Sequence, residues 1–500
     1  MAAVLDLERR ARRAGTAAAL VALAAGVPTL NRILVGVFYD DGLYAGLALA
    51  LAQGDGYVHP HLPGTPAGVH YPPLYPLVLA PFFGSLPLAQ AALAAKVANL
   101  LLAALAAGLV AWHVTRARLV EDGAPWWLGA AAATAGAVAI PLLTTQAVLF
   151  AEPLFAVLLA TAVAQADHGR PWRAGVAAAL ALLTRSIAVA AGAGIVLYLL
   201  ILRRAGWRPA LRAGMPVAIG AALWGSWVLL HRSGIDPALA LNYGTYGDAL
   251  AQAGVSALGR SVPELLRPLG AITLGWLPGA APYLVLGALG LGVLGTGMVV
   301  LARRSSAGLT LIGYFLILAV WPYPPDRFLW VVLPWIAVAW AAGAAALWRR
   351  RPLRLPVALV TGAILLGYGL YEVRGFRGRW WAGAARAIST NFEELVPALR
   401  ILPEEAVLAT DDEALVWLYT RRRAVPLYLY SYRGSQTVEP TPAAHRAYLE
   451  RQGVTHVVLA SPASPSARQL RALIGAYPGW LVPVRGWPGG RWLYAVRRAP

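Results

Sequence analysis

The sequence predicts an α-helical polytopic membrane protein with a small α/β domain in its C-terminal part. Three observations lead to this prediction: the composition, the length of the apolar runs and the distribution of the arginines. Of the 500 residues, 59% are hydrophobic and only 13% are charged, and the mean hydropathy is +0.59. Soluble chains rarely have such a composition, so a cytosolic enzyme is excluded.

The apolar runs predict about eleven spanning helices, because about 20 apolar residues in a helix cross the roughly 30 Å hydrocarbon core of a bilayer. The first run follows an arginine-rich stretch, but it lacks a convincing cleavage site before Asp40, so we interpret it as a retained helix and not as a signal peptide. The helices are expected near residues 14–36, 88–115, 125–140, 144–165, 173–184, 187–202, 211–231, 281–302, 308–322, 328–348 and 355–372.

The arginines predict the orientation of these helices. If the N-terminus is cytoplasmic, the segments on that side carry arginine clusters, as in 9–13, 203–212 and 349–354. Before the C-terminal part, the opposite side holds only Arg32, Arg185, Arg232, Arg260, Arg267 and Arg327. Because basic residues collect on the cytoplasmic side of membrane proteins, we expect a multi-pass protein of the plasma membrane with a cytoplasmic N-terminus.

Three regions outside the helices are expected to lie on the extracytoplasmic side. Residues 37–87 and 232–280 are long loops rich in Gly and Pro, and 44–53 reads as a short helix in the membrane interface. Residues 374–500 read as a separate α/β domain, which leaves residues 1–373 as the transmembrane domain. The expected strands are 406–409, 425–429, 454–459 and 492–496, and the expected helices are 442–452 and 466–476.

Cysteine and charge usage exclude several kinds of site. The chain has no cysteine, which excludes disulfide frameworks, zinc–thiolate sites and thiol nucleophiles. The net charge of +19 comes almost entirely from arginine, since Lys96 is the only lysine. Most of these arginines lie between apolar segments, where the bilayer explains them, so nucleic acid is not an expected partner.

The few carboxylates near the extracytoplasmic side are the candidate catalytic groups. Asp40 and Asp41 directly follow the first expected helix. Adjacent acids at the mouth of a membrane cavity suit a general base or a metal-linked site, whereas the alternative is a pair of solvated loop residues. Glu152 lies in the apolar stretch 146–160, and acids inside a membrane by default mark a functional site.

Three cations on the same side are candidates for binding an anion. Arg185 and Arg327 interrupt apolar sequence on the side that the positive-inside bias disfavours for arginine. A guanidinium can hold a phosphate with two parallel hydrogen bonds, and interfacial anchoring is the alternative for each arginine. Lys96 lies within the second expected helix, where it either meets an anion or snorkels to the surface.

Histidines in the first loop are weaker candidates for a metal site. His59, His61 and His70 share the loop with the two aspartates, and such a set can bind a divalent cation. The sequence contains no HxxxH or HExxH spacing, which weakens the case for a metal site. A divalent cation remains a cofactor candidate only because the residue types suit one. The 19 Trp and 20 Tyr residues are typical of an aromatic belt, and some of them can also stack on sugar rings.

Three motifs carry a resemblance to a known family. They are Tyr39-Asp-Asp-Gly-Leu-Tyr-Ala-Gly-Leu-Ala, Gly54-Asp-Gly-Tyr and His70-Tyr-Pro-Pro-Leu-Tyr-Pro-Leu-Val-Leu-Ala-Pro. Together they resemble the first luminal or periplasmic loop of the GT-C glycosyltransferases. Within these the chain is most similar to the bacterial glycosyltransferase family 39 and the aminoarabinose-transferase-like group. The resemblance extends to the later acid, the two arginines and the C-terminal domain.

The resemblance implies a glycosyltransferase of the cell envelope, in the inner membrane, with a GT-C catalytic domain over 1–373. Such an enzyme moves a sugar from a polyprenyl-phosphate donor to a glycan, lipid or protein acceptor on the outer face, with inversion at the anomeric carbon. Asp40 or Asp41 would be the base and Glu152 a second acid, while Arg185, Arg327 and Lys96 would bind the donor phosphate. The substrate cavity would include Tyr44, His70, Tyr71, Pro72, Pro73 and Tyr75. Tyr71 departs from the family pattern, in which a lysine often precedes the two prolines.

Two other classes of protein remain as alternatives. One is a secondary transporter or flippase of a lipid-linked or anionic substrate, which usually shows paired halves with broken helices; this chain shows no such internal repeat. The other is a non-catalytic membrane assembly protein that binds a partner through Asp411, Asp412 and Glu413. The simpler interpretation of these three acids is a solvated loop beside a strand.

Overall fold

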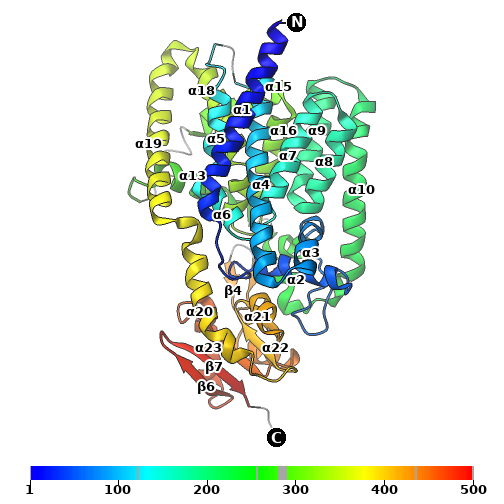
Figure 1. Cartoon of the computed structure of the whole chain (residues 1–500), viewed down its shortest axis with the longest axis vertical. Coiled ribbons are helices and arrows are strands. Elements are labelled where there is room, and N and C mark those ends of the chain that lie inside the picture. The colour runs from blue at the N-terminus through cyan, green and yellow to red at the C-terminus, as the bar shows by residue number, and fades with distance from the viewer. Residues whose placement is uncertain (1, 121–122, 255–256, 280–289, 434–435, 498–500) are drawn as a thin grey trace. The chain divides into compact units, whose positions relative to one another are not determined.

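The computed structural model describes residues 2–120, 123–254, 257–279, 290–433 and 436–497. Its contacts divide the chain into two compact units (Figure 1). The helical unit comprises Met1–Leu30, Lys96–Gly225 and Ala257–Trp381. The mixed unit comprises Asn31–Ala95, Ser226–Ser256 and Ala382–Pro500, so it combines parts of both long loops with the C-terminal part of the chain.

The helical unit is a bundle of helices with small residues at the contacts. Helix α7 packs against α8, α9 against α16, and α18 against both α5 and α15 (Figure 1). The helices that form the unit are α1 (Ala2–Gly26), α4 (Leu88–Arg116), α5 (Leu128–Ala137), α6 (Ile140–Ala147), α7 (Glu152–Asp167), α8 (Pro171–Thr184), α9 (Val189–Leu197), α10 (Trp207–His231), α13 (Ala257–Leu274), α15 (Leu291–Arg304), α16 (Ser306–Leu318), α17 (Asp326–Val331), α18 (Leu333–Trp348) and α19 (Arg354–Gly378).

Close packing of α15 on α18 depends on two glycines. A Cβ atom on Gly297 would lie 1.7 Å from the carbonyl oxygen of Ala339, and one on Gly343 would lie 2.0 Å from that of Val293. No side chain fits at these distances, so the two backbones can approach each other only at glycine. This use of small residues is typical of helix contacts in membranes.

Prolines place several helix boundaries differently from the sequence prediction. The first helix ends at Gly26 and not near 36, because Pro28 falls in a 3₁₀ turn that follows it. The run 125–147 bends by 50° between α5 and α6, with Pro141 at the start of α6. Among the described residues, three helices are long and apolar enough to cross a membrane, or four if this bent pair counts as one span, and others are shorter apolar helices. Residues 281–289 of the expected helix 281–302 lie outside the described residues.

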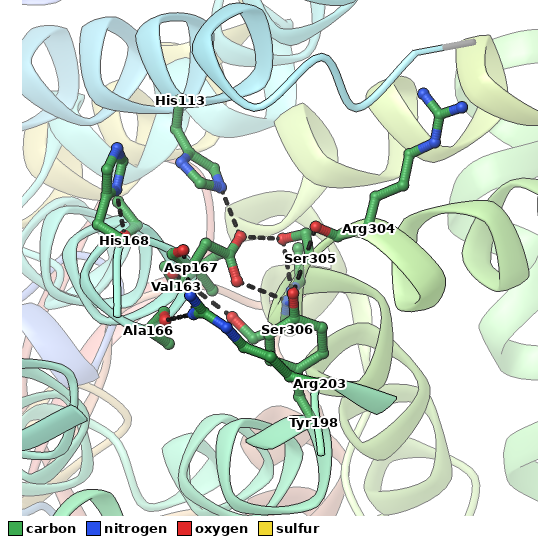
Figure 2. A network of polar contacts seen from close by, with 12 residues as sticks. His113, Val163, Ala166, Asp167, His168, Tyr198, Arg203, Arg304, Ser305 and Ser306 are labelled. Carbon is green, nitrogen blue, oxygen red and sulfur yellow. Dashed lines mark hydrogen bonds and ion pairs between the residues drawn. The ribbon is translucent and has the colours of Figure 1, made fainter. Parts of the chain in front are cut away.

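A polar network, here called the clasp, joins the ends of α4, α7 and α16 (Figure 2). Asp167, the last residue of α7, is hydrogen-bonded to His113 Nε2 at 2.9 Å through Oδ2. The same carboxylate accepts hydrogen bonds from the Ser305 hydroxyl at 2.5 Å and from the Ser306 backbone N–H at 2.8 Å. A negative charge at the start of α16 also meets the positive end of the helix dipole. The clasp therefore fixes the end of α7 that is opposite Glu152.

The mixed unit contains a five-stranded sheet in the order β2-β1-β5-β7-β6 and a separate antiparallel pair β3-β4. Strand β1 runs parallel to β2 and β5, whereas β7 is antiparallel to β5 and β6. The strands are β1 (Val407–Thr410), β2 (Arg423–Pro426), β3 (Ser431–Arg433), β4 (Gln436–Val438), β5 (His456–Leu459), β6 (Leu481–Trp487) and β7 (Arg491–Val496). The helices are α2 (Asp40–Gln53), α3 (Leu74–Ser85), α11 (Ala240–Tyr243), α12 (Tyr246–Ala253), α20 (Gly383–Leu399), α21 (Glu413–Thr420), α22 (Pro442–Arg451) and α23 (Pro465–Ala476).

The three acids after β1 are not a solvated loop, so that interpretation was wrong. Glu413 begins α21 with a side chain that is fully buried, and Asp411 and Asp412 are only partly exposed. Burial and the neighbouring acids raise the pKa of Asp412 well above its usual range. Asp411 accepts a hydrogen bond from the Ser466 hydroxyl at 2.5 Å. The acids therefore belong to the interior of the mixed unit, which also argues against their use as an exposed contact patch.

Candidate functional site

The candidate residues form two groups, each inside one compact unit. The acidic group lies in the mixed unit around Asp40 at the start of α2. The arginine group lies in the helical unit around Glu152 at the start of α7.

A strained turn presents the two aspartates at the N-terminus of α2. Tyr39 has φ 61° and ψ −74°, and the Asp40 N–H donates to the Phe38 carbonyl at 2.7 Å, so Tyr39 is the centre of a γ-turn with positive φ. Such turns are rare and costly, and they are found where the surrounding structure holds them for a function. The turn places both carboxylates in the first helical turn, where the helix dipole stabilises negative charge.

The Asp41 carboxylate accepts hydrogen bonds from the backbone of the segment that precedes α2. Its side chain is 1% exposed, and its two oxygens accept hydrogen bonds from the N–H groups of Gly36 and Phe38, each at 2.9 Å. Gly36 has φ 101°, a conformation that favours glycine. Asp41 therefore holds the loop that leads into α2, and its oxygens are directed at the backbone.

Asp40 has a different environment from its neighbour. It is partly exposed, and one of its oxygens accepts a hydrogen bond from the Tyr71 hydroxyl at 2.7 Å. Tyr71 is buried and packs against Tyr44 at 4.8 Å between ring centroids, and Tyr44 packs in turn against Tyr75 at 5.0 Å. Burial, and then the charge of Asp40, raise the pKa of Tyr71 well above its usual range, so Tyr71 stays protonated and donates. Asp40 is thus an oriented carboxylate with access to solvent.

His70 and the following prolines connect this carboxylate to the second loop. His70 Nδ1 lies 2.8 Å from the carbonyl oxygen of Gly244, and the His70 ring packs between those of Tyr71 and Tyr246. Pro72 and Pro73 follow directly and lead into α3. The structure therefore brings together in one unit every residue that the sequence assigned to the cavity in the first loop.

His61 belongs to a buried chain of hydrogen-bonded groups that the sequence did not reveal, and the His59 ring packs beside it. His61 Nε2 lies 2.8 Å from the Tyr243 hydroxyl, which donates in turn to Glu413. Burial, opposed by the bond from Tyr243, raises the pKa of Glu413 to about 8, and burial lowers the pKa of His59 to about 3. Both groups are therefore neutral at neutral pH. The sequence singled out Glu413 only as part of an exposed patch, and it did not link this acid to Tyr243 or His61, because the three residues lie in different parts of the chain.

No metal site follows from these histidines in the part of the chain that the structure describes. No three side chains of His, Cys, Asp or Glu in that part are placed to hold one ion. His59 packs edge-on against Tyr243, and His70 is engaged by a backbone carbonyl.

In the helical unit, Glu152 brings the two candidate arginines together. Glu152 is fully buried, and its Oε1 accepts from Arg185 Nη1 and from Arg327 Nε and Nη2, the latter two at 3.1 Å. The guanidiniums also lie over aromatic rings, Arg185 at 4.4 Å from the Phe328 centroid and Arg327 at 3.8 Å from that of Phe150. One carboxylate oxygen thus holds two guanidiniums close together, and guanidinium groups of this kind can bind carboxylate or phosphate oxygens with parallel hydrogen bonds.

Lys96 lies on α4 of the same unit and is 2% exposed. It is three residues from Asn99, so both side chains share one face of the helix. Asn99 donates to the carbonyls of Val148 and Phe150, at 3.5 and 3.0 Å, in the segment that leads to Glu152. Lys96 therefore faces the helix packing and not the lipid.

Comparison with known proteins supports the fold but gives no relative by sequence. No family model matches the chain, and no curated protein matches it. Among solved structures, the chain is similar to ArnT from Cupriavidus metallidurans in the apo state, with 15% identity, a TM-score of 0.55, and coverage of 95% of this chain and 96% of that chain. It also matches an oligosaccharyltransferase from Archaeoglobus fulgidus tethered with an acceptor peptide, with 12% identity, a TM-score of 0.49, and coverage of 97% and 74%. The match to ArnT confirms the predicted GT-C fold with its C-terminal domain.

Proposed function

We propose that this protein is an integral membrane glycosyltransferase that moves a sugar from a polyprenyl-phosphate donor to a hydroxyl group of an acceptor. ArnT, whose fold it has, is an aminoarabinose transferase of the GT-C type. The observation that carries the proposal is Asp40, a partly exposed carboxylate held in place by the Tyr71 hydroxyl at 2.7 Å. The proposed site of reaction is the extracytoplasmic face, with the N-terminus in the cytoplasm.

Asp40 acts as the general base. The acceptor oxygen attacks the anomeric carbon, the bond from that carbon to the phosphate oxygen breaks, and the polyprenyl phosphate leaves with the electron pair. The acceptor proton passes to the Asp40 carboxylate, which a partly exposed acid can later release to water. A single displacement of this kind inverts the anomeric carbon.

Arg185 and Arg327 bind the donor phosphate. Glu152 holds the two guanidiniums side by side, and the planar fork of a guanidinium matches phosphate oxygens with parallel hydrogen bonds. The positive charge also stabilises the negative charge that develops on the leaving phosphate. Glu152, with both arginines on one oxygen, is a positioning residue in this scheme, and Lys96 is a further cation of the same unit.

The test is release of polyprenyl phosphate by the purified protein when both a lipid-linked sugar and an acceptor are present. We expect release with the parent protein and little with Asp40→Asn. If the lipid-linked sugar crosses the membrane of a proteoliposome intact and no phosphate is released, the protein is a flippase and the proposal fails. Repeating the assay with a chelator shows whether a divalent cation takes part.

A further inference from the structure

The mixed unit contains a pocket of about 290 Å³ that none of the proposed catalytic groups occupies. Its walls come from the second loop and from the segments before β3 and around α22. The side chains that matter for its chemistry are Gln252, Tyr430, Ser431, Tyr448 and Arg451. The volume is close to the lower end of the range for small-molecule sites, roughly 300–1,000 Å³. No carboxylate is among the described residues that line it.

Tyr430 supplies a rigid aromatic wall. Its ring stacks on that of Tyr428, with centroids 5.4 Å apart and planes at 22°, and Tyr428 does not line the pocket. Tyr430 also makes an edge-to-face contact with Tyr432, with centroids 5.9 Å apart, so two aromatic neighbours hold its ring in place. Burial, and then Tyr432, Tyr428 and Asp40, raise the pKa of Tyr430, so the phenol stays neutral and lies within the electrostatic reach of Asp40. The wall is apolar on its face and carries a hydroxyl at its edge.

Polar side chains next to Tyr430 can hydrogen-bond to a ligand in the pocket. Tyr448 also lines the pocket, but it is 1% exposed and its hydroxyl is buried, so this residue adds to the wall and not to the hydrogen-bonding groups. The oxygen of Gln252 accepts from the Tyr432 N–H at 3.3 Å, which leaves its NH₂ group as a donor.

Polar contacts between the second loop and the end of α22 also hold the walls of the pocket in place. Asp236, just before the segment that lines one wall, accepts from the Gln452 amide at 2.8 Å and lies 3.6 Å from Arg451. These contacts join the second loop to the end of α22. A pre-formed pocket loses less conformational entropy on binding than a flexible one.

We propose that this pocket binds one pyranose unit of a saccharide. The C–H face of the sugar packs on Tyr430, and its hydroxyls meet Gln252 and Ser431. A sugar fits because it combines an apolar face for the aromatic wall with many neutral hydroxyls for the polar side chains, and no carboxylate is among the described residues that line the pocket to select a cation. The proposal rests on the proposed function for its source of sugar, which is either the donor or a saccharide acceptor.

Binding is tested first by saturation-transfer NMR on the full chain in nanodiscs, prepared without maltoside detergents because these carry sugars. The probes are methyl glycosides of common hexoses and pentoses. We expect transfer to at least one probe, about tenfold weaker binding for Tyr430→Ala, and unchanged binding for Tyr494→Ala, a tyrosine of β7 that does not line the pocket. If no probe binds, or if the two variants bind alike, the proposal is overturned.

A second variant keeps the test decisive if Tyr430→Ala is poorly folded. Ala447 lines the pocket on an exposed face of α22, so Ala447→Phe fills the pocket without removing a buried group. Loss of binding in this variant, with an unchanged melting temperature, supports the proposal, and normal binding contradicts it.

Turnover then identifies the source of the sugar. If Tyr430→Ala raises the KM for the acceptor but leaves hydrolysis of the donor by water unchanged, the pocket holds the acceptor. If it slows hydrolysis as well, the pocket holds the sugar of the donor. Because the NMR measurement needs no turnover, failure of glycosyl transfer with intact binding would overturn the proposed function and not the pocket.

Discussion

Asp40 and Asp41 are neighbours in the chain, yet their carboxylates serve different partners. Asp41 is buried and accepts two backbone N–H groups, from Gly36 and Phe38. Asp40 is partly exposed and accepts the Tyr71 hydroxyl. The γ-turn at Tyr39 turns the chain sharply just before the pair. The sequence left open which acid is the base, and this geometry favours Asp40.

The first prediction concerns Asp40. Asn keeps the shape of the side chain and can still accept from Tyr71, but it cannot take a proton. Asp40→Asn should therefore lower turnover by about 10²-fold or more, while donor binding and the melting temperature stay near those of the parent. Rates of polyprenyl phosphate release give the result. Near-normal turnover would make Glu152 the next candidate for the base.

The second prediction concerns Asp41. Replacing it by Asn leaves an amide that can accept only one of the two backbone hydrogen bonds well, and without charge. We expect a loss of stability of about 1.5–3 kcal/mol, the range for a hydrogen bond to a charged group. Thermal unfolding measures it, with Asp55→Asn as control, because Asp55 is an exposed acid just after α2. Equal melting temperatures for the two variants would refute the structural role.

The sequence alone could identify the candidate site residues but not the contacts that distinguish their roles. Acids and arginines within apolar sequence stand out locally, so Asp40, Asp41, Glu152, Arg185 and Arg327 could all be found. That one oxygen of Glu152 holds both arginines depends on tertiary contacts between segments far apart in sequence.

Apolar runs located most helices of the helical unit, since length and periodicity are local properties, but only three or four helices among the described residues meet the length and composition of a spanning helix, against about eleven expected. The acids after β1 were misinterpreted for the opposite reason. Three consecutive acids look solvated in isolation, but Glu413 is buried because Tyr243, from the second loop, hydrogen-bonds to it. The hydrogen bond from Tyr71 to Asp40 could not be predicted either, since no local sequence pattern links residues that are 31 positions apart.

The third prediction concerns Tyr71. Its hydroxyl donates to Asp40 and thereby favours the ionised carboxylate. Tyr71→Phe removes this donor, so a larger fraction of Asp40 is protonated at a given pH and the acidic limb of the pH–rate profile should move to higher pH. At high pH the rate should recover most of the parental value. A profile that falls uniformly at all pH values would show that Tyr71 acts only through packing.

The fourth prediction is a pH dependence of stability that comes from Glu413. Burial raises the pKa of Glu413 to about 8 in the folded protein, above the value of 4.5 for an exposed glutamate. Between these values the folded state binds the proton more tightly than the unfolded state, so this group makes stability fall as the pH rises from about 4.5 to 8. Glu413→Gln keeps an acceptor for Tyr243 and removes the titration. The variant should be relatively more stable than the parent at pH 8.5, and the gap should close by pH 5. A constant gap across this range would contradict the assignment.

The fifth prediction separates the roles of the arginine group. Lysine keeps the charge of an arginine, so an ion pair with Glu152 survives, but lysine cannot hold a phosphate with two parallel hydrogen bonds. Arg185→Lys and Arg327→Lys should each weaken donor use by about 1.5–3 kcal/mol, a loss of roughly ten- to hundredfold in kcat/KM for the lipid-linked sugar. The melting temperature should stay close to that of the parent. Arg267→Lys is the matched control, because Arg267 pairs with Asp326 at 3.7 Å on an exposed side chain.

Glu152→Ala should behave in the opposite way to the lysine variants. Removing the Glu152 carboxylate takes away the anion that the two guanidiniums share, and breaking a buried ion pair from one side costs about 3–5 kcal/mol. Stability is therefore lost first, and an anion that takes the place of the carboxylate should restore part of it. We expect the lipid-linked donor to raise the melting temperature of Glu152→Ala more than that of the parent. If the donor raises neither, or if both lysine variants work normally, the arginines do not bind the donor phosphate, and only the acidic group in the mixed unit remains as a candidate for the chemistry.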